Sequence, residues 1–308
     1  MKSERIPLAV ITGPTASGKT GLSLAVCEAF DGEVICADSM QVYRGMPIAS
    51  AAPTPQEKAR VPHHLFEFLD PGTPFCVAEY VEMAHREIRA VAAKGKLPVL
   101  VGGTGLYIDS VVDNITFVPE KSDPQLRSEL ECRFDELGGE GMLRSLAEFD
   151  PQAAARLHPN DRRRIIRAFE IHTLTGLDSK EQRLLSHREE SPYRPIMLAV
   201  SCRERQNLYN RINARVDQMV GNWLVEEARR WIDQPGQTAC QAIGHKELAP
   251  YFSGKKSLEE CLKHLKQQTR RYAKRQLTWF RRDERIHWVF SDDPGMTDQA
   301  ITYIRERL

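Results

Sequence analysis

The sequence predicts an α/β fold, in which a parallel sheet is flanked by helices and interrupted by an all-helical domain. Short apolar runs that resemble buried strands recur along the chain, at residues 6–11, 33–37, 97–101 and 195–201. Such runs are typical of parallel strands that are covered on both faces. Helical patterns alternate with them, but between residues 119 and 190 only helical patterns occur. We therefore expect a core domain made of residues 1–118 and 191–308, with a helical insertion domain at 119–190.

The bulk composition is that of a soluble globular protein. Of 308 residues, 41% are hydrophobic and 28% are charged, with a net charge of +1. The seven cysteines form no Cys-x-x-Cys pair, which argues against a disulfide framework or zinc ribbon and for a reducing compartment. No apolar run approaches the roughly 20 residues that span a bilayer, and the N-terminal residues lead straight into the first strand without a signal peptide. We expect a cytoplasmic monomer without membrane contact.

The first predicted strand leads into Gly13-Pro14-Thr15-Ala16-Ser17-Gly18-Lys19-Thr20, and a helical pattern follows. A strand, a glycine-bounded turn and a helix are the context of a phosphate-binding P-loop. Backbone N–H groups of the turn can cradle phosphate oxygens at the helix N-terminus. Lys19 adds a positive charge, and the Thr20 hydroxyl can hold Mg²⁺. The alternative is a chance match in an ordinary turn, which the flanking strand and helix disfavour.

The second strand ends at Asp38-Ser39-Met40-Gln41. Because ligands of open α/β sheets bind at the carboxyl ends of the strands, we expect Asp38 to face the same crevice as the P-loop. A role of Asp38 as a simple turn cap is the alternative. Residues 44–76 are predicted to form a long loop. For His63-His64 within it, a structural or substrate-contact role is favoured over metal binding, because no cysteine or acidic partner lies at ligand spacing.

The strand at 97–101 leads into a second glycine-rich turn, Gly102-Gly103-Thr104-Gly105. A P-loop ATPase usually carries an aspartate at such a strand end to help hold Mg²⁺, and this chain has Gly102 and Thr104 instead. The pattern therefore disfavours energy-coupled ATP hydrolysis and favours transfer chemistry on a bound phosphorylated substrate.

Two basic segments follow. In the predicted insertion, whose helical patterns cover 125–137, 142–148, 151–157 and 160–175, residues 162–167 hold four arginines beside Ile165 and Ile166. Taken alone, this cluster is equally consistent with a solvated charged face. In the helix predicted at 258–282, residues 263–285 contain nine Lys/Arg against two acids, with Tyr272, Trp279 and Phe280 interleaved. This pattern favours nucleic-acid contact over a charged helix that merely packs through its aromatic side chains.

Between the two basic segments, the strand at 195–201 leads into an arginine-bearing helix. Arg211 and Arg215 are four residues apart and share one helical face. Arg203 and Arg205 follow the strand end, where a guanidinium group can reach phosphate oxygens. The chain closes with a strand at 286–290 and a short helix.

Taken in order, these motifs resemble one family, the tRNA dimethylallyltransferases, also called tRNA isopentenyltransferases or IPP transferases. The resemblance covers nearly the whole chain, through residues 13–20, 38–46, 62–65, 102–107, 163–170, 215–219 and 271–280. It implies a P-loop NTPase-like core. It also implies transfer of a dimethylallyl group from dimethylallyl diphosphate to the exocyclic amine of the adenine adjacent to the anticodon in tRNA. The P-loop would then bind the diphosphate of the prenyl donor.

The resemblance also implies residue roles. Asp38 would accept the amine proton, Thr104 would help hold the flipped adenine or its phosphate, and Arg215 would act with Lys19 and Thr20-bound Mg²⁺ on the departing diphosphate. The residues expected to contact the tRNA anticodon stem-loop are Asp38, Ser39, Met40, Gln41, Thr104, Arg127, Arg163, Arg164, Ile165, Ile166, Arg167, Arg271, Lys274 and Arg275.

The chain departs from the family pattern at three places. Residues 47–53 lack a usual carboxylate and lysine, Arg163 replaces a glutamine, and His245 replaces a tyrosine. These departures concern the geometry around the tRNA loop and the substrate range. Three alternatives stay open: a P-loop small-molecule kinase, a prenyltransferase of free adenine nucleotides, and a tRNA-binding module with a vestigial P-loop. Whether ATP or another nucleoside triphosphate also binds the P-loop is left open too.

Overall fold

The computed structural model describes residues 5–117, 123–187, 189–234 and 241–308. It forms two compact units. The first, the core unit, comprises Met1–Val112 and Ser191–Leu308, and the second, the insertion unit, comprises Asp113–Glu190. In the described part of the chain, no helix has the length and apolarity that crossing a bilayer requires.

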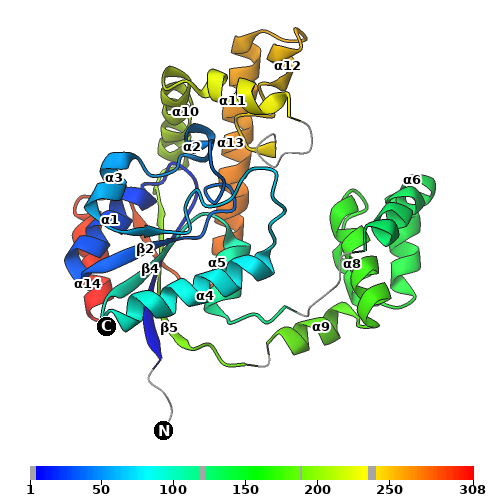
Figure 1. The fold of residues 1–308 in the computed structure, drawn as a ribbon, viewed down its shortest axis with the longest axis horizontal. Coiled ribbons are helices and arrows are strands. Elements are labelled where there is room, and N and C mark those ends of the chain that lie inside the picture. Colours follow the sequence, from blue (N-terminus) through cyan, green and yellow to red (C-terminus); the bar gives the residue numbers. More distant parts are fainter. Residues whose placement is uncertain (1–4, 118–122, 188, 235–240) are drawn as a thin grey trace. The chain divides into compact units, whose positions relative to one another are not determined.

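The core unit contains the parallel sheet that the sequence predicts (Figure 1). Its six strands are all paired in parallel, in the order β3-β2-β4-β1-β5-β6. The strands are β1 (Ile6–Thr12), β2 (Gly32–Cys36), β3 (His63–His64), β4 (Leu97–Val101), β5 (Tyr193–Ser201) and β6 (His287–Phe290). Because β1 lies between β4 and β5, the turn after β1 is at the centre of the sheet's carboxyl edge.

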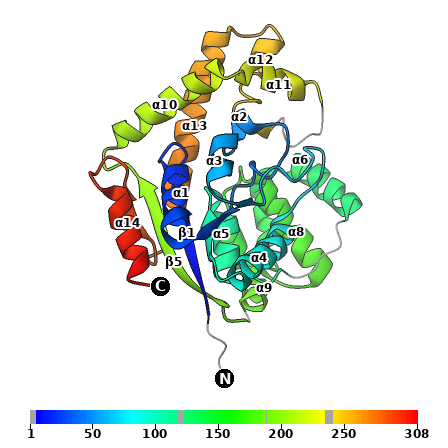
Figure 2. The same ribbon diagram turned by 60° about the vertical axis from the view of Figure 1, so that its left-hand side comes forward.

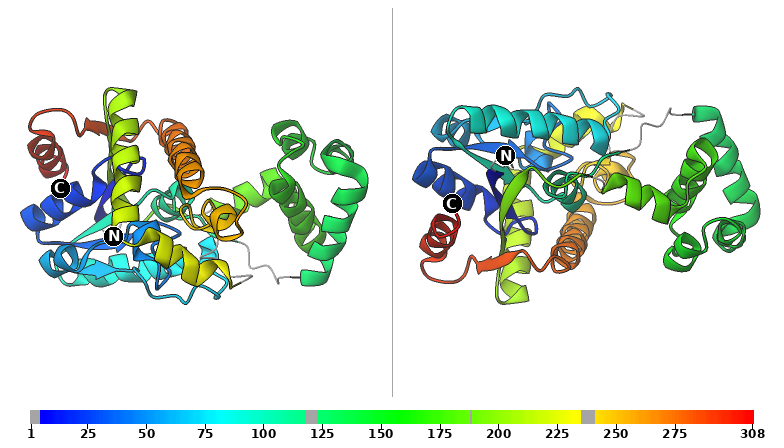
Figure 3. Two further views of the ribbon diagram at one scale, coloured as in Figure 1. Left: turned by 90° about the horizontal axis from the view of Figure 1, so that it is seen from above. Right: turned by 90° about the horizontal axis from the view of Figure 1, so that it is seen from below.

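Helices cover both faces of the sheet. On one face, α1 (Lys19–Phe30) and α14 (Met296–Arg305) contact each other and pack on alternate strand residues such as Ile11, Val99 and Leu198 (Figure 2). On the other face, α4 (Val77–Ala93) packs against β2 and β4, and α5 (Gly105–Val112) packs against α4 (Figure 3). The two-sided cover explains why the strand sequences are continuous apolar runs.

Further helices extend from the carboxyl edge of the sheet. They are α10 (Arg205–Gly221), α11 (Leu224–Ile232), α12 (Ala249–Phe252) and α13 (Leu258–Phe280). A separate apolar cluster, with Val216, Leu224, Leu248 and Leu265 at its centre, joins these four helices. Helix α13 runs back along α10 and reaches α5, so that its C-terminal half lies close to the sheet edge.

The prediction of one long loop over residues 44–76 is wrong in part. This region contains α2 (Pro47–Ser50), α3 (Pro55–Arg60) and the two-residue strand β3. Helix α3 begins with a capping box, in which Thr54 and Glu57 satisfy each other's backbone N–H groups, and Pro55 occupies the first helical position. That spacing is a helix-start signal, but the frequent prolines and small residues around it suggest a loop.

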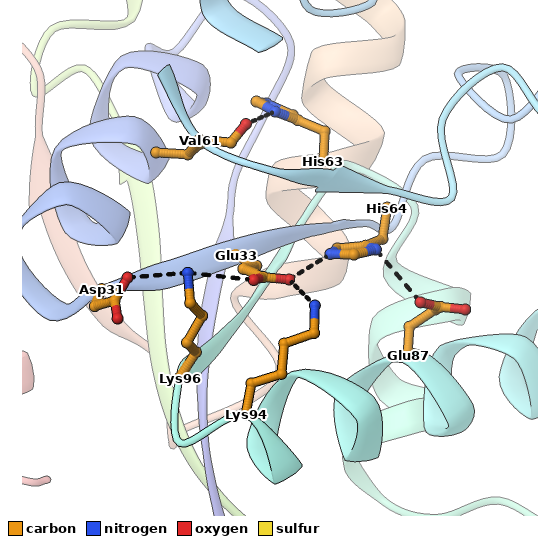
Figure 4. A network of polar contacts seen from close by, with 8 residues as sticks. All are labelled: Asp31, Glu33, Val61, His63, His64, Glu87, Lys94 and Lys96. Carbon is orange, nitrogen blue, oxygen red and sulfur yellow. Dashed lines mark hydrogen bonds and ion pairs between the residues drawn. The ribbon is translucent and has the colours of Figure 1, made fainter. Parts of the chain in front are cut away.

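His64 belongs to a polar network at the amino ends of β2 and β4 (Figure 4). Its Nε2 lies 2.7 Å from Glu33 and its Nδ1 lies 3.3 Å from Glu87. Burial raises the pKa of the Glu33 carboxyl, but hydrogen bonds from Lys94, His64 and Lys96 outweigh it and hold that pKa below its usual value. The network fastens the edge strand β3 to β2 and α4, which is a structural role for His64. Among the described residues, no group of three or more His, Cys, Asp or Glu side chains could hold a metal ion.

The insertion unit is helical wherever the structure assigns regular elements. Its helices are α6 (Pro124–Ala147), α7 (Pro151–Arg156), α8 (Arg162–Thr175) and α9 (Ser179–Ser186). Helix α6 is broken at Gly138, which has φ 65° and ψ 173°, so it corresponds to two of the predicted helices. The unit has its own apolar core around Met142, Leu146 and Ile165. Helix α9, which the sequence patterns do not predict, begins with a capping box of Asp178 and Glu181.

Candidate active site

The turn between β1 and α1 has the backbone shape of a phosphate-binding loop. Gly13 has φ +133° and Gly18 has φ +107°, values that L side chains rarely adopt. A Cβ on Gly13 would lie 2.2 Å from the carbonyl oxygen of Val200 on β5, so this glycine lets the loop sit directly against the neighbouring strand. Lys19 and Thr20 then open α1. The strand, turn and helix that the motif requires are all present.

The Lys19 ammonium folds back over this loop. Its Nζ donates to the carbonyl oxygens of Gly13, at 3.0 Å, and Pro14, at 2.8 Å. Burial and then the nearby Arg215 guanidinium lower the pKa of Lys19 from 10.5 to about 8, and the Asp38 carboxylate opposes them. An anionic ligand at this position would favour the charged ammonium.

Two arginines from α10 reach the same loop. Arg215 Nη1 donates to Thr15 Oγ1 at 3.4 Å. Burial lowers the pKa of Arg215, and Asp38 opposes that effect. One turn earlier, Arg211 Nη1 donates to Ser291 at 2.6 Å, and its Nη2 is 3.4 Å from where a Cβ on Gly18 would be. The predicted shared face of these arginines therefore lies over the P-loop.

Arg203 and Arg205 do not join them. Arg203 forms an ion pair with Asp293 and lies over the Phe290 ring, and Arg205 donates to the Tyr209 hydroxyl at 2.6 Å. The expectation that these two side chains reach phosphate oxygens is not supported, because local partners hold both guanidinium groups.

Asp38 and Thr104 lie together beside these cations. Asp38 Oδ1 accepts the Met40 backbone N–H at 2.9 Å, while Thr104 Oγ1 accepts the Ser39 N–H at 2.9 Å and lies 3.3 Å from the Ser39 hydroxyl. The Asp38 carboxylate acts electrostatically on both Lys19 and Arg215. The carboxylate therefore lies near two cations. Among the described residues, no hydrogen bond is recorded between Asp38 and either Lys19 or Arg215.

Protein neighbours account for the glycines of the second turn. A Cβ on Gly102 would lie 2.0 Å from the Ala37 carbonyl oxygen, one on Gly103 would lie 2.3 Å from Gln276 Nε2, and one on Gly105 would lie 2.2 Å from Trp279. Ala37, which directly follows β2, and two side chains of α13 therefore occupy the space beside these glycines.

Two departures from the family pattern meet beside this site. Gln41 Nε2 donates to the carbonyl oxygens of Ser50 and Ala51, at 3.0 and 2.9 Å. The buried Glu227 carboxylate accepts the backbone N–H groups of Ile48 and Ala49, at 2.9 and 2.8 Å. His245 Nε2 lies 3.0 Å from the same carboxylate. The unusual histidine is thus part of the support for the unusual segment at residues 47–52, which in turn holds Gln41.

Helix α13 presents different residues to the core and to solvent. Ala273, Gln276 and Phe280 are buried, and Trp279 Nε1 donates to Asp109 of α5 at 2.8 Å. The exposed basic residues include the predicted tRNA contacts Arg271, Lys274 and Arg275. Lys266 pairs with Asp217 and Arg270 donates to Asn213, so these two cations attach α13 to α10. Phe280 and Trp279 therefore attach α13 to the core, whereas the basic side chains of Arg271, Lys274 and Arg275 face solvent.

In the insertion unit, the predicted tRNA contacts fall into three groups. Arg163 and Arg164 are exposed on α8, whereas Ile165 and Ile166 are buried in the unit's core. The prediction that these two isoleucine side chains contact tRNA is therefore not supported, since the 3.6-residue period of the helix turns them inward. Arg127 and Arg167 both pair with Glu170, at 3.2 and 3.3 Å.

The donor set suits Mg²⁺ only in combination with a phosphorylated ligand. Mg²⁺ usually keeps several waters and is held by one or two protein oxygens together with substrate phosphates. Thr20 supplies a hydroxyl at the start of α1, beside the turn whose N–H groups and cations suit phosphate. The residues present therefore fit a magnesium–diphosphate ligand, with Thr20 as the predicted protein contact.

Sequence reasoning missed the role of Gln276 and Trp279 within this site. These residues are three apart on α13, and their partners Gly103 and Gly105 are two apart in the second turn. The similar spacing of the two glycines and of the two helix residues could have indicated this contact. However, a single sequence does not show which of two distant segments pack together.

The chain is similar to several known proteins. A family model described as IPP transferase matches residues 41–283, and one described as isopentenyl transferase matches residues 6–63. The tRNA dimethylallyltransferase of Moorella thermoacetica is 45% identical over 99% of this chain and 95% of its own length, and that of Bacillus subtilis is 42% identical over 96% and 94%.

Solved structures agree. The tRNA isopentenylpyrophosphate transferase of Bacillus halodurans is 40% identical, with a TM-score of 0.71 over 98% of this chain and 97% of its own. A eukaryotic dimethylallyltransferase acting on tRNA is 26% identical, with a TM-score of 0.83 over 98% of this chain and 80% of its own.

Proposed function

The chain belongs to the IPP transferase family, whose curated relatives are tRNA dimethylallyltransferases. We propose that it transfers a dimethylallyl group from dimethylallyl diphosphate to the exocyclic amine of the adenine adjacent to the anticodon in tRNA. One observation carries this proposal: Lys19 and Arg215 contact the P-loop at Gly13 and Thr15, and Asp38 lies within electrostatic reach of both cations. This arrangement supports the proposal because a candidate base lies next to cations that can bind diphosphate.

At the donor, the bond between the allylic carbon and the diphosphate oxygen breaks, and negative charge develops on the leaving group. The backbone N–H groups at the N-terminus of α1, together with the side chains of Lys19 and Arg215, would stabilise that charge. Preorganised donors of this kind commonly supply several kcal/mol of transition-state stabilisation. Mg²⁺, held by Thr20 and diphosphate oxygens, would neutralise part of the same charge.

At the acceptor, the amine nitrogen bonds to the allylic carbon and loses a proton. Asp38 Oδ1 already accepts the Met40 N–H, so Oδ2 is the oxygen that would take this proton. The amine proton becomes acidic as the new bond forms, which eases its transfer to a carboxylate. Thr104, fixed by its contacts with Ser39, would help hold the adenine once it has been flipped out of its stack.

The tRNA would bind through the exposed basic residues of α13, with Arg163 and Arg164 of the insertion unit as further contacts. Arg271, Lys274 and Arg275 are exposed and follow one another along a single helix. Contacts of this kind position an RNA backbone, whereas the unstacked bases of a loop are read by stacking and edge contacts.

The decisive experiment incubates the protein with labelled dimethylallyl diphosphate and unmodified tRNA. Label should enter one adenine beside the anticodon, and Asp38→Asn should strongly lower this incorporation while tRNA still binds. Parallel reactions contain ATP with small-molecule acceptors, and the prenyl donor with AMP or ADP. Phosphoryl transfer from ATP would contradict the proposal, as would prenylation of free nucleotides at a rate matching tRNA.

A further inference from the structure

Gln276 is a buried polar side chain at the centre of the proposed site, and the mechanism above does not use it. It lies on α13, only 5% exposed, on the side of the helix that faces the sheet. The residues predicted to contact tRNA, Arg271, Lys274 and Arg275, are exposed within two turns of it. One helix therefore carries both an RNA-facing surface and a group that reaches into the site.

The Gln276 amide bonds to both glycine-rich turns at once. Its Oε1 accepts the backbone N–H of Thr15 in the P-loop at 2.9 Å. Its Nε2 donates to the carbonyl oxygen of Gly103 in the second turn, also at 2.9 Å. A side-chain amide offers a strong acceptor and a strong donor on one planar group. Gln276 thus joins the predicted diphosphate loop to the turn that carries Thr104.

The fit leaves little room for movement. The position that a Cβ on Gly103 would occupy is 2.3 Å from Gln276 Nε2 and 3.7 Å from Asp38 Oδ2. One turn along α13, Trp279 lies against Gly105 in the same way and donates to Asp109. A displacement of α13 at this point would therefore shift the second turn, the P-loop at Thr15, or both.

We propose that Gln276 is a positioning residue that couples the donor and acceptor sites, so that tRNA bound along α13 and diphosphate bound in the P-loop strengthen each other's binding. This inference rests on the proposed function. Each ligand fixes one of the two turns, and the amide transmits that order to the other turn through two directed hydrogen bonds. Because coupling between binding sites is reciprocal, either ligand must raise the affinity of the other by the same factor.

Substitutions at position 276 separate the two bonds. Gln276→Leu removes both and leaves the Thr15 N–H and the Gly103 carbonyl without their partner, which costs stability as well as coupling. Gln276→Glu keeps an acceptor for Thr15 but places a carboxylate oxygen against the Gly103 carbonyl. Thr269→Val is the matched control, because the buried Thr269 hydroxyl bonds only to Leu265 of its own helix among the contacts recorded.

The experiment measures binding of inorganic pyrophosphate with Mg²⁺ by calorimetry, with and without an unmodified anticodon stem-loop RNA. We expect the RNA to tighten pyrophosphate binding in the wild type by about fivefold or more, the lower end of typical coupling. In Gln276→Glu and Gln276→Leu the ratio should fall towards one and kcat should fall, while the affinity for RNA alone changes little. Thr269→Val should keep the wild-type ratio.

A wild-type ratio of one, or an unchanged ratio in a folded Gln276→Glu variant, would overturn the inference. Thermal unfolding of each variant shows whether it is folded. If Gln276→Leu does not fold, the test relies on Gln276→Glu. Prenyl transfer by the wild type is assayed in the same preparations. If transfer occurs without coupling, the inference alone fails, and if no transfer occurs, the proposed function fails.

Discussion

The pH dependence of donor use should report the ionisation of Lys19. Burial and the neighbouring Arg215 lower the pKa of its ammonium to about 8, and only the charged form can stabilise a diphosphate. A group with that pKa is mostly charged near neutral pH and mostly neutral one unit above its pKa. From about pH 7 to about pH 9, kcat/KM for dimethylallyl diphosphate should therefore fall roughly tenfold.

The assay is initial-rate prenyl transfer at saturating tRNA, with the donor varied at each pH. The pH profile of kcat/KM reports the pKa of Lys19 in the free enzyme, whereas that of kcat reports its pKa in the bound complex. Because bound diphosphate favours the charged ammonium, kcat should fall at a higher pH than kcat/KM does. Lys19→Arg is the control, because a guanidinium group stays charged throughout this range. A flat wild-type profile up to about pH 9.5, or the same limb in Lys19→Arg, would refute the assignment.

Three further outcomes are expected. Asp38→Asn should lower transfer by about 10²–10⁴-fold, which is the usual effect of losing a general base, and should keep its affinity for tRNA in a filter-binding assay. A variant with normal turnover would show that Asp38 is not the base. Replacing both Arg271 and Lys274 with Ala should weaken tRNA binding and reduce the slope of log affinity against log salt by about 0.7 per lost phosphate contact. An unchanged slope would show that these residues of α13 do not contact the tRNA backbone. Trp223 is 69% exposed and has φ +73°, so Trp223→Gly should stabilise the protein by about 0.5–1 kcal/mol in thermal unfolding, and a lower melting temperature would show that its side chain contributes more than its backbone strain costs.

The parts of the fold that follow from the sequence are those with a strong local signal. Buried strand runs such as Leu97–Val101 predict a parallel sheet because covered strands leave no room for polar side chains. Strand β3 is not predicted because its two residues carry too little pattern, and because its side-chain contact, between His64 and Glu33, joins segments about 30 residues apart. The position of a residue on its helix also limits the prediction. Ile165 and Ile166 lie within the basic segment 162–167 and are among the expected tRNA contacts, but both side chains are buried.

For the site, the sequence predicts candidate catalytic residues but not the contacts that hold them in place. Asp38, Thr104, Lys19 and Arg215 all follow from motifs at strand ends or on one helical face. The support from Glu227 and Gln276 depends on tertiary contacts between segments more than a hundred residues apart, as with Glu227 and Ile48 or Gln276 and Thr15. A single sequence contains no pattern that joins such segments.

Gly103 and Gly105 bring the second turn into direct contact with α13. In a P-loop ATPase the turn beside the P-loop usually offers a carboxylate for Mg²⁺, whereas here it is pressed against the side chains of Gln276 and Trp279. A helix with an exposed basic surface therefore lies beside the P-loop of this chain, where a P-loop ATPase usually has a metal-binding side chain. If α13 binds tRNA as proposed, the acceptor substrate acts on the donor loop through one amide, and the chain has a physical means of making prenyl transfer depend on tRNA rather than on water or a free nucleotide.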